Sequence, residues 1–284
     1  MLQGGLRRVG IKRAAGEPAR KAAPLARKPA RFRKRSYRSS EQPVVSVIIP
    51  VMNERRTIAA ILRQVYQVHP QTEVIVVANG SKDGTEAIAR RMGARVVSYD
   101  WPLGHDVGRA IGARMARGRV LLFTDGDIVI SARDFHPLVR AVEKGRVDVA
   151  LNDYSGPVHK MDVHNVVLAK HALNYSLGRA DLGGASLTAI PHALSRKALE
   201  SIGVENLAVP PMAHAIAVHG GLQVRAVHHV DVGRKNRIRR RSGNTDPLEQ
   251  LIVGDHLEAL HWITQHVGPR GGKTDLFRAR EMAR

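Results

Sequence analysis

The chain is predicted to adopt an α/β fold with a mainly parallel, doubly wound sheet. Short runs rich in β-branched residues alternate with segments whose apolar residues recur at helical spacing. The first run, VVSVIIP (44–50), is almost wholly apolar, as in a strand buried on both faces. With 284 residues, the chain is long enough for one large domain of this class. Strands that alternate with helices form right-handed crossovers and therefore a parallel sheet.

The individual elements follow from the same periodicities. In the first half, strands are predicted at 44–50, 72–78, 94–99 and 119–124, with helices within 53–68, 79–93 and 104–118. The second half is less regular. Strands are predicted at 146–153 and 222–233, and helices at 164–178, 192–203 and 245–268.

The amino-terminal segment differs in composition from the rest. Residues 1–40 carry 13 Lys and Arg against one acid, Glu17, which is a net charge of +12 out of +20 for the chain. The segment lacks apolar periodicity, so we predict a disordered basic tail over 1–42. One continuous domain is expected over 43–284, with a first half at 43–150 and a second half at 151–284.

Composition excludes several classes of protein. The chain has no cysteine, which excludes disulfides and thiolate metal sites. It has no apolar run of about 20 residues, as a membrane span requires, and no apolar signal core, so a cytoplasmic location is expected. The basic tail is either a solvated extension without a role, or a contact with nucleic acid or with an anionic membrane at its inner face.

Polar clusters follow three of the predicted strands. They are Pro50–Glu54, Asn79–Thr85 and Asp125–Asp127. The carboxyl ends of parallel strands meet at one edge of a sheet, where ligands of such folds bind. Asp125 and Asp127 repel each other unless a positive charge lies between them, and a divalent cation that also carries a diphosphate fits that position. A polar turn around Gly126 is the structural alternative.

Four motifs resemble those of the family 2 nucleotide-sugar glycosyltransferases of the Rossmann-like A-type fold. They are VSVIIPVMNERRTI, EVIVVANGSKDGT, GHDVGRAIGA and GRVLLFTDGDIVI, in the family's order, within residues 44–150. The resemblance implies that the ribose lies at Asp125 and that Asp127 holds Mn²⁺ or Mg²⁺ at the diphosphate. It implies a nucleotide-sugar pocket formed by Pro50, Val51, Asn53, Glu54, Asn79, Asp83, Gly104, Arg109 and Gly126. For the glycine-bearing helix, close packing against the sheet is the alternative to a contact with the nucleotide.

Two positions depart from the family's pattern. The family has two acids where this chain has Ala78 and Asn79, and the second acid accepts the N3–H of uracil. An amide oxygen can also accept that bond, so a UDP-sugar donor is favoured and a guanosine donor stays open. The family often has an aromatic residue at the position of Met52, which would stack on the base.

The second half is expected to supply the acceptor site. Asp153, Asp181 and Glu205 are the candidates for a general base. The stretch HHVDVGRKNRIRRR (228–241) resembles part of the glucosyl-3-phosphoglycerate synthases, in which a late histidine completes the metal site. This resemblance implies that His229 is a metal ligand, and two structural histidines are the alternative. The basic run that follows is expected to lie over a diphosphate or an anionic acceptor, or to be a solvated loop.

The sequence therefore predicts a metal-dependent glycosyltransferase that moves a sugar from a nucleotide-diphosphate donor to an unknown acceptor. A sugar nucleotidyltransferase of similar fold is the first rival, although PVMNERRT (50–57) is not the glycine-rich basic loop it requires. A nucleic-acid-binding protein is the second rival, because the isoelectric point is near 11. An inactive member of the family that only binds its ligand is the third.

Overall fold

The structure is a computed structural model that describes residues 37–158, 163–235 and 247–283. The described part contains a seven-stranded sheet in the order β3-β2-β1-β4-β6-β5-β7. The strands are β1 (Val45–Val51), β2 (Thr72–Asn79), β3 (Arg95–Tyr99), β4 (Val120–Phe123), β5 (Val149–Asn152), β6 (His192–Ser195) and β7 (Val224–His228). Only β6 runs against its neighbours β4 and β5. The predicted mainly parallel α/β fold is confirmed.

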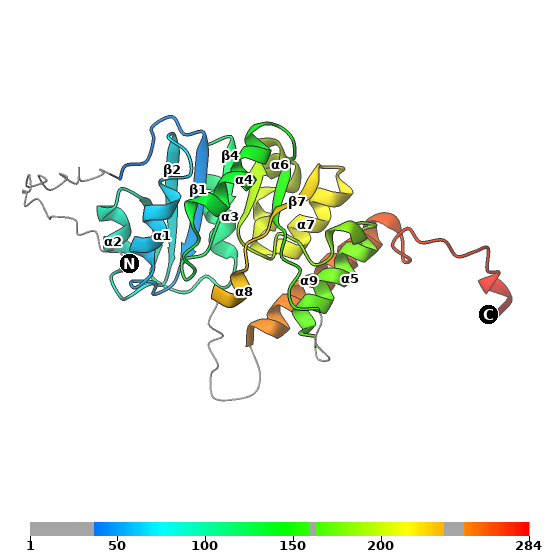
Figure 1. Ribbon diagram of the computed structural model, residues 1–284. Helices are drawn as coiled ribbons and strands as arrows, with labels where there is room; N and C mark the ends of the chain where they lie inside the picture. The colour runs from blue at the N-terminus through cyan, green and yellow to red at the C-terminus, as the bar shows by residue number, and fades with distance from the viewer. Residues whose placement is uncertain (1–36, 159–162, 236–246, 284) are drawn as a thin grey trace, which may run out of the picture. The chain divides into compact units, whose positions relative to one another are not determined.

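Helices cover both faces of the sheet (Figure 1). One face packs against α1 (Ile58–Val65), α2 (Thr85–Arg91) and α4 (Ala132–Glu143). The other packs against α3 (Val107–Met115), α6 (Arg196–Ile202), η2 (Val204–Ala208) and α7 (Pro210–His219). Nearly every residue of β1 and β2 is buried, which explains their almost continuous apolar sequence.

A third group of helices extends the second half. Helix α5 (Asn165–Ser176) lies beside α9 (Pro247–Val267), and both contact α7 (Figure 1). Buried apolar residues of all three helices form a separate cluster. Short elements complete the described fold: η1 (Ala180–Leu182), α8 (Val232–Lys235) and η3 (Arg280–Ala283).

One element was assigned to the wrong class. The sequence predicts a helix over 192–203, but residues 192–195 form β6 and the helix starts at Arg196. The strand fills the space between β4 and β5 and pairs with both. Ser195 marks the true start of the helix, because its hydroxyl accepts a 3.0 Å hydrogen bond from the Ala198 N–H.

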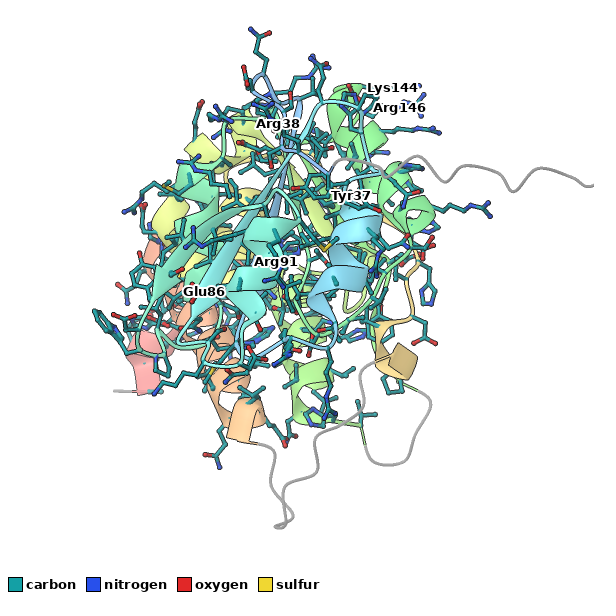
Figure 2. The ribbon with its side chains drawn as sticks, turned by 90° about the vertical axis from the view of Figure 1, so that its left-hand side faces the viewer. Tyr37, Arg38, Glu86, Arg91, Lys144 and Arg146 are labelled. Atoms are coloured by element: carbon teal, nitrogen blue, oxygen red, sulfur yellow. The ribbon has the colours of Figure 1, made fainter. Side chains whose placement is uncertain are left out.

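The ordered core begins earlier than the predicted boundary at residue 43. The ring of Tyr37 lies 5.5 Å from that of Tyr66, just beyond α1 (Figure 2). The Ser39 hydroxyl accepts a bond from the Val74 N–H and donates to the Gly93 carbonyl. Residues 37–42 therefore belong to the domain, since these polar groups replace hydrogen bonds that a solvated tail would make to water. The rest of the predicted tail lies outside the described residues.

Candidate functional site

The carboxyl ends of the parallel strands meet at one edge of the sheet, which we call the strand-end edge. Because β6 runs in the opposite direction, its first residue, His192, also lies there, paired with Phe123 at the end of β4. All residues that the sequence assigns to the nucleotide follow or end β1, β2, β3 or β4, except Arg109, which lies in the first turns of α3. The topology thus brings the predicted cluster to one edge.

The loop after β4 is pressed against the end of β1. A Cβ atom on Gly126 would lie 2.6 Å from Val51 Cγ1 and 3.0 Å from the Pro50 carbonyl oxygen, so only glycine fits. The Thr57 hydroxyl donates to the Gly126 carbonyl over 2.6 Å. This contact fixes the exposed Asp127 and the half-buried Asp125 on either side of Gly126. Thr57 was not singled out from the sequence.

The loops after β1 and β2 hold each other through side chains. The Asn53 amide oxygen accepts a 2.8 Å bond from the Lys82 N–H, and Asp83 accepts one of 2.9 Å from the Arg55 N–H. Asn53 has a φ of 60°, a conformation that asparagine tolerates better than most residues. Desolvation opposes the charge on Asp83, but hydrogen bonds from Thr85 and Arg55 outweigh it and lower the carboxyl pKa.

The Asn79 amide is engaged by the loop that follows β3. Its oxygen accepts a hydrogen bond from the Leu103 N–H, and its nitrogen donates to the Gly104 carbonyl over 3.0 Å. The family resemblance assigns this position to the base. In the structure the side chain fixes the loop at 103–104, and the amide oxygen keeps one lone pair for a further donor.

Arg109 lies under the strand-end edge and is almost fully buried. Its guanidinium contacts Asp106 Oδ1 over 3.0 Å and Asp125 Oδ1 over 3.4 Å. It also donates to the Leu187 carbonyl over 3.3 Å. The side chain is 5% exposed, so the donors that a phosphate would require face protein oxygens. Both aspartates stabilise the charge against burial and raise the guanidinium pKa.

Glycines in α3 serve packing. A Cβ atom on Gly108 would lie 3.1 Å from Pro50 Cβ, and Gly112 lies directly against Ile48. The alternative predicted for this helix, close approach to the sheet, therefore holds for these two residues. Gly104 is different, because its φ of 100° requires glycine, whereas a Cβ atom there would meet only an ordinary contact with Val107 Cγ2 at 4.0 Å.

His192 is a buried residue of the edge that the sequence analysis did not identify. Its ring stacks on Phe123 with 5.0 Å between centroids, and its Nδ1 lies 3.0 Å from the Ala189 carbonyl. Burial and the nearby Arg109 charge lower its pKa to about 3, so the imidazole is neutral at pH 7. No periodicity marks such a residue, because its environment comes from β4 and α3.

Asp153 and His229 lie together where β5 and β7 end. Asp153 is exposed, and its carbonyl oxygen lies 2.6 Å from His229 Nδ1. The pairing of β5 and β7 shifts register between Leu151 and Asn152, and β7 ends at His228, so the strand predicted over 222–233 is shorter than expected and does not include His229. His228 turns to Asp134 of α4, with 3.4 Å between Nε2 and Oδ1.

The other two candidate bases lie in different surroundings. Asp181 of η1 forms two 2.8 Å hydrogen bonds with Arg179, and these bonds lower its carboxyl pKa. Arg179 also donates to the Val224 carbonyl over 2.9 Å, beside a 390 Å³ cavity along β7. Glu205 is an exposed residue of η2, which packs against α3 and α7. An ion-paired carboxylate is a weak proton acceptor, which disfavours Asp181 as a base.

No three His, Asp or Glu side chains among the described residues are grouped closely enough to hold a metal ion. His229 therefore does not form such a group with Asp125 and Asp127. β6 and β5 separate the end of β4 from that of β7, roughly 14 Å at ordinary strand spacing. In the basic run, Arg237 and Arg239–Arg241 lie outside the described residues, as do the side chains of Arg234 and Lys235.

Solved structures share this arrangement. Glucosyl-3-phosphoglycerate synthase from Mycobacterium tuberculosis in complex with UDP superposes with a TM-score of 0.55 and 23% sequence identity, over 82% of each chain. Its complex with Mn²⁺, UDP and glucosyl-3-phosphoglycerate gives a TM-score of 0.53 at 22% identity, over 82% of this chain and 81% of that one. At these identities the likeness establishes the fold, which is the predicted A-type fold.

Similarity in sequence gives the family. Glycosyltransferase AglE of Haloferax volcanii is 40% identical over 97 residues, 31% of this chain and 32% of that protein. Polyprenol monophosphomannose synthase of Mycolicibacterium smegmatis is 29% identical over 168 residues, 55% of this chain and 63% of that protein. The chain thus spans less than two thirds of either relative. The family model described as glycosyl transferase family 2 matches residues 46–200, more than half of the chain. The chain therefore belongs to glycosyltransferase family 2.

Proposed function

We propose that this protein transfers a sugar from a nucleotide-diphosphate sugar, with UDP favoured, to an acceptor that is still to be identified. The observation that carries the proposal is the pair Asp125 and Asp127 at the strand-end edge, on a loop that Gly126 presses against β1. The family match and the solved UDP complexes of a protein with the same fold support it. Among the described residues, no helix is long and apolar enough to cross a bilayer.

The carboxylates suit a divalent cation. Mg²⁺ and Mn²⁺ prefer oxygen ligands, and one or two carboxylates commonly hold them together with phosphate oxygens and water. Asp127 is exposed and Asp125 is one-third exposed, so both can reach an ion that a diphosphate brings with it. When bound, the cation would neutralise charge on the leaving diphosphate. The protein's own part is to hold both carboxylates in place before the donor arrives.

His229, in the segment that follows β7, is suited to join such a site. A carbonyl oxygen only accepts hydrogen bonds, so the 2.6 Å contact with the Asp153 carbonyl places the proton on Nδ1. Nε2 then carries the lone pair that binds a metal. The ring of Tyr154 lies 6.1 Å from that of His229. Burial together with the Asp231 charge raises the pKa of the Tyr154 hydroxyl. We keep His229 as the proposed third ligand.

Asp153 is the proposed general base among the three candidates. It is exposed at the strand-end edge, whereas Asp181 is paired with Arg179 and Glu205 lies on η2. Its role is to take the proton from the acceptor hydroxyl as the sugar is transferred. Replacing Asp153 with asparagine should lower kcat with little change in donor affinity, and the same change at Asp181 should leave kcat nearly unchanged.

The decisive experiment is calorimetry with UDP in the presence and absence of Mn²⁺. Wild type should bind UDP tightly only with the metal, and Asp127→Ala should remove that gain. Glu200→Ala, which removes an exposed carboxylate from α6, is the matched control and should bind as wild type does. Equal affinity with and without metal in wild type would contradict the proposal.

The acceptor and the rival functions need separate assays. Relatives include, by name, a polyprenol monophosphomannose synthase and a dodecaprenyl-phosphate galacturonate synthase. UDP- and GDP-sugars should therefore be tested with polyprenyl phosphate and with 3-phosphoglycerate, with product detected by mass spectrometry. Removing residues 1–36 should leave UDP binding intact. A nucleic-acid-binding protein would instead lose its affinity with those residues.

A further inference from the structure

Asp106 has an unusual backbone conformation at the start of α3. Its φ of 62° and ψ of −18° place it in the left-handed region, although it is not glycine. Such residues store strain, and they are retained where the surrounding structure or the function requires them. Aspartate at a helix N-cap ordinarily accepts a backbone N–H. The Asp106 side chain makes no such capping bond.

The Asp106 carboxylate is directed to Arg109 instead. Its Oδ1 lies 3.0 Å from Arg109 Nε, and its side chain is only 6% exposed. Its Oδ2 lies 3.4 Å from His105 Nε2. The strained backbone therefore delivers a buried negative charge to one side of the guanidinium.

Two further groups hold the other side of Arg109. Nη2 contacts Asp125 Oδ1 over 3.4 Å, and Nη1 donates to the Leu187 carbonyl over 3.3 Å. The guanidinium is planar, so fixing its Nε end fixes the direction of both terminal nitrogens. Asp106 thus determines from which side Arg109 approaches Asp125, although Asp106 and Asp125 are 19 residues apart in sequence.

We infer that Asp106 is a positioning residue of the donor site, which acts through Arg109 to orient the Asp125 carboxylate. The inference rests on the proposed function. Asp125 is 34% exposed, so the carboxylate that Arg109 contacts through Oδ1 remains accessible to a ligand. Removing the Asp106 charge releases the Nε end of the guanidinium, and only the weaker contacts of Nη1 and Nη2 with Leu187 and Asp125 then orient it.

A second buried carboxylate that pairs with an arginine provides the control. Glu73 is 1% exposed and accepts bonds from Arg117 and from Ser46 at the opposite edge of the sheet. It joins β1, β2 and the turn before β4, and it lies at the other ends of these strands from Asp125. Glu73→Gln therefore removes the charge of another buried, arginine-paired carboxylate without touching the donor site.

The test measures UDP binding with Mn²⁺ by calorimetry for Asp106→Asn, Glu73→Gln and wild type, with thermal melting as the measure of folding. Asp106→Asn should weaken UDP binding about tenfold or more, as expected when a charge-assisted contact is misplaced. Glu73→Gln should change it less than about twofold at a similar loss of thermal stability. Asp106→Glu, which keeps the charge, should recover part of the lost affinity.

A double-mutant cycle separates positioning from general damage. If Asp106 acts through Asp125, then Asp106→Asn should have little further effect in an Asp125→Asn background. An equal loss of affinity in both backgrounds, or a loss no larger than that of Glu73→Gln, would overturn the inference. Absence of UDP binding by wild type would instead refute the proposed function, and thermal melting would show whether the fold was intact.

Discussion

The buried side chain of Asn152 forms two hydrogen bonds with Val230, one to its backbone N–H and one to its backbone carbonyl. The Asn152 amide oxygen accepts from the Val230 N–H over 2.8 Å, and its nitrogen donates to the Val230 carbonyl over 3.0 Å. The same nitrogen donates to the Ile190 carbonyl over 2.8 Å. Where the pairing of β5 and β7 loses its register, these side-chain hydrogen bonds stand in for backbone bonds between the strands. They also hold the segment that carries His229.

Asn152→Ala should destabilise the protein by about 2–4 kcal/mol, because it removes three hydrogen bonds to the backbone of the buried residues Val230 and Ile190. Urea denaturation followed by circular dichroism measures the change. Asn165→Ala is the control, since Asn165 is exposed and its side chain bonds to a single described residue, Glu249 on α9. That change should stay within about 1 kcal/mol. Equal effects of the two substitutions would show that the Asn152 bonds add little stability.

Lys170 makes the free energy of unfolding depend on pH in the alkaline range. Burial lowers its ammonium pKa from 10.5 to about 8, and its Nζ donates only to the Tyr154 carbonyl over 3.2 Å among the described residues. Between pH 8 and 10.5 the unfolded chain binds more protons than the folded protein, so this group makes stability rise with pH across that window. A shift of this size corresponds to at most about 3 kcal/mol.

Lys170→Met should remove that rise. Urea denaturation at pH 8 and at pH 10 should show a smaller gain for the variant than for wild type. Lys197→Met is the control, because Lys197 is 72% exposed beside Asp148, and it should keep the wild-type profile. The same gain in all three proteins would contradict the assignment.

Asp255 of α9 makes the free energy of unfolding depend on pH in the acidic range. Burial, with the charges of Asp106 and Glu258, raises its carboxyl pKa from 3.8 to about 6. A raised carboxyl pKa adds stability below pH 4 that is lost as the pH rises through 6. Asp255→Asn should therefore stabilise the protein at pH 7 by on the order of 1 kcal/mol after solvent screening. The difference in stability between Asp255→Asn and wild type should narrow towards pH 4, as measured by thermal melting. A difference that stays constant with pH would refute the raised pKa of Asp255.

Gly126→Ala should disrupt the donor site. The added methyl group meets Val51 Cγ1 at 2.6 Å, and the loop that carries Asp125 and Asp127 must move away from β1. UDP affinity with Mn²⁺ should fall by about tenfold or more. Gly254→Ala is the matched control, since nothing lies within 4 Å of its Cβ position in α9. That change should slightly stabilise the protein, by about 0.5–1 kcal/mol, and leave UDP affinity unchanged.

The sequence predicts those features of the fold that depend on local patterns. β1, β2 and the aspartates after β4 carry strong periodic or motif signals, and the structure places them as expected. β6 has four residues, too few for a period, and its extended form depends on pairing with β4 and β5.

Side-chain partners were harder to predict than the elements. Arg109 was assigned to the nucleotide-sugar pocket, and its partner Leu187, 78 residues away, becomes a neighbour only after the chain folds. Asn79 was expected to contact the base, and its bonds to the loop at 103–104 likewise depend on where β3 ends. Periodicity reports which face of an element is buried, and it carries no information on which distant atom a polar group meets.

The bond from Arg179 to the Val224 carbonyl also protects the sheet from other molecules. β7 is the outermost strand of the described sheet, and such edges invite pairing with a strand of another chain. The Gln223 carbonyl is used by β5, so alternation turns the Val224 carbonyl outward, where Arg179 occupies it. Asp181 holds that guanidinium in place. Asp181 thereby supports the contact that occupies a backbone acceptor on this exposed strand.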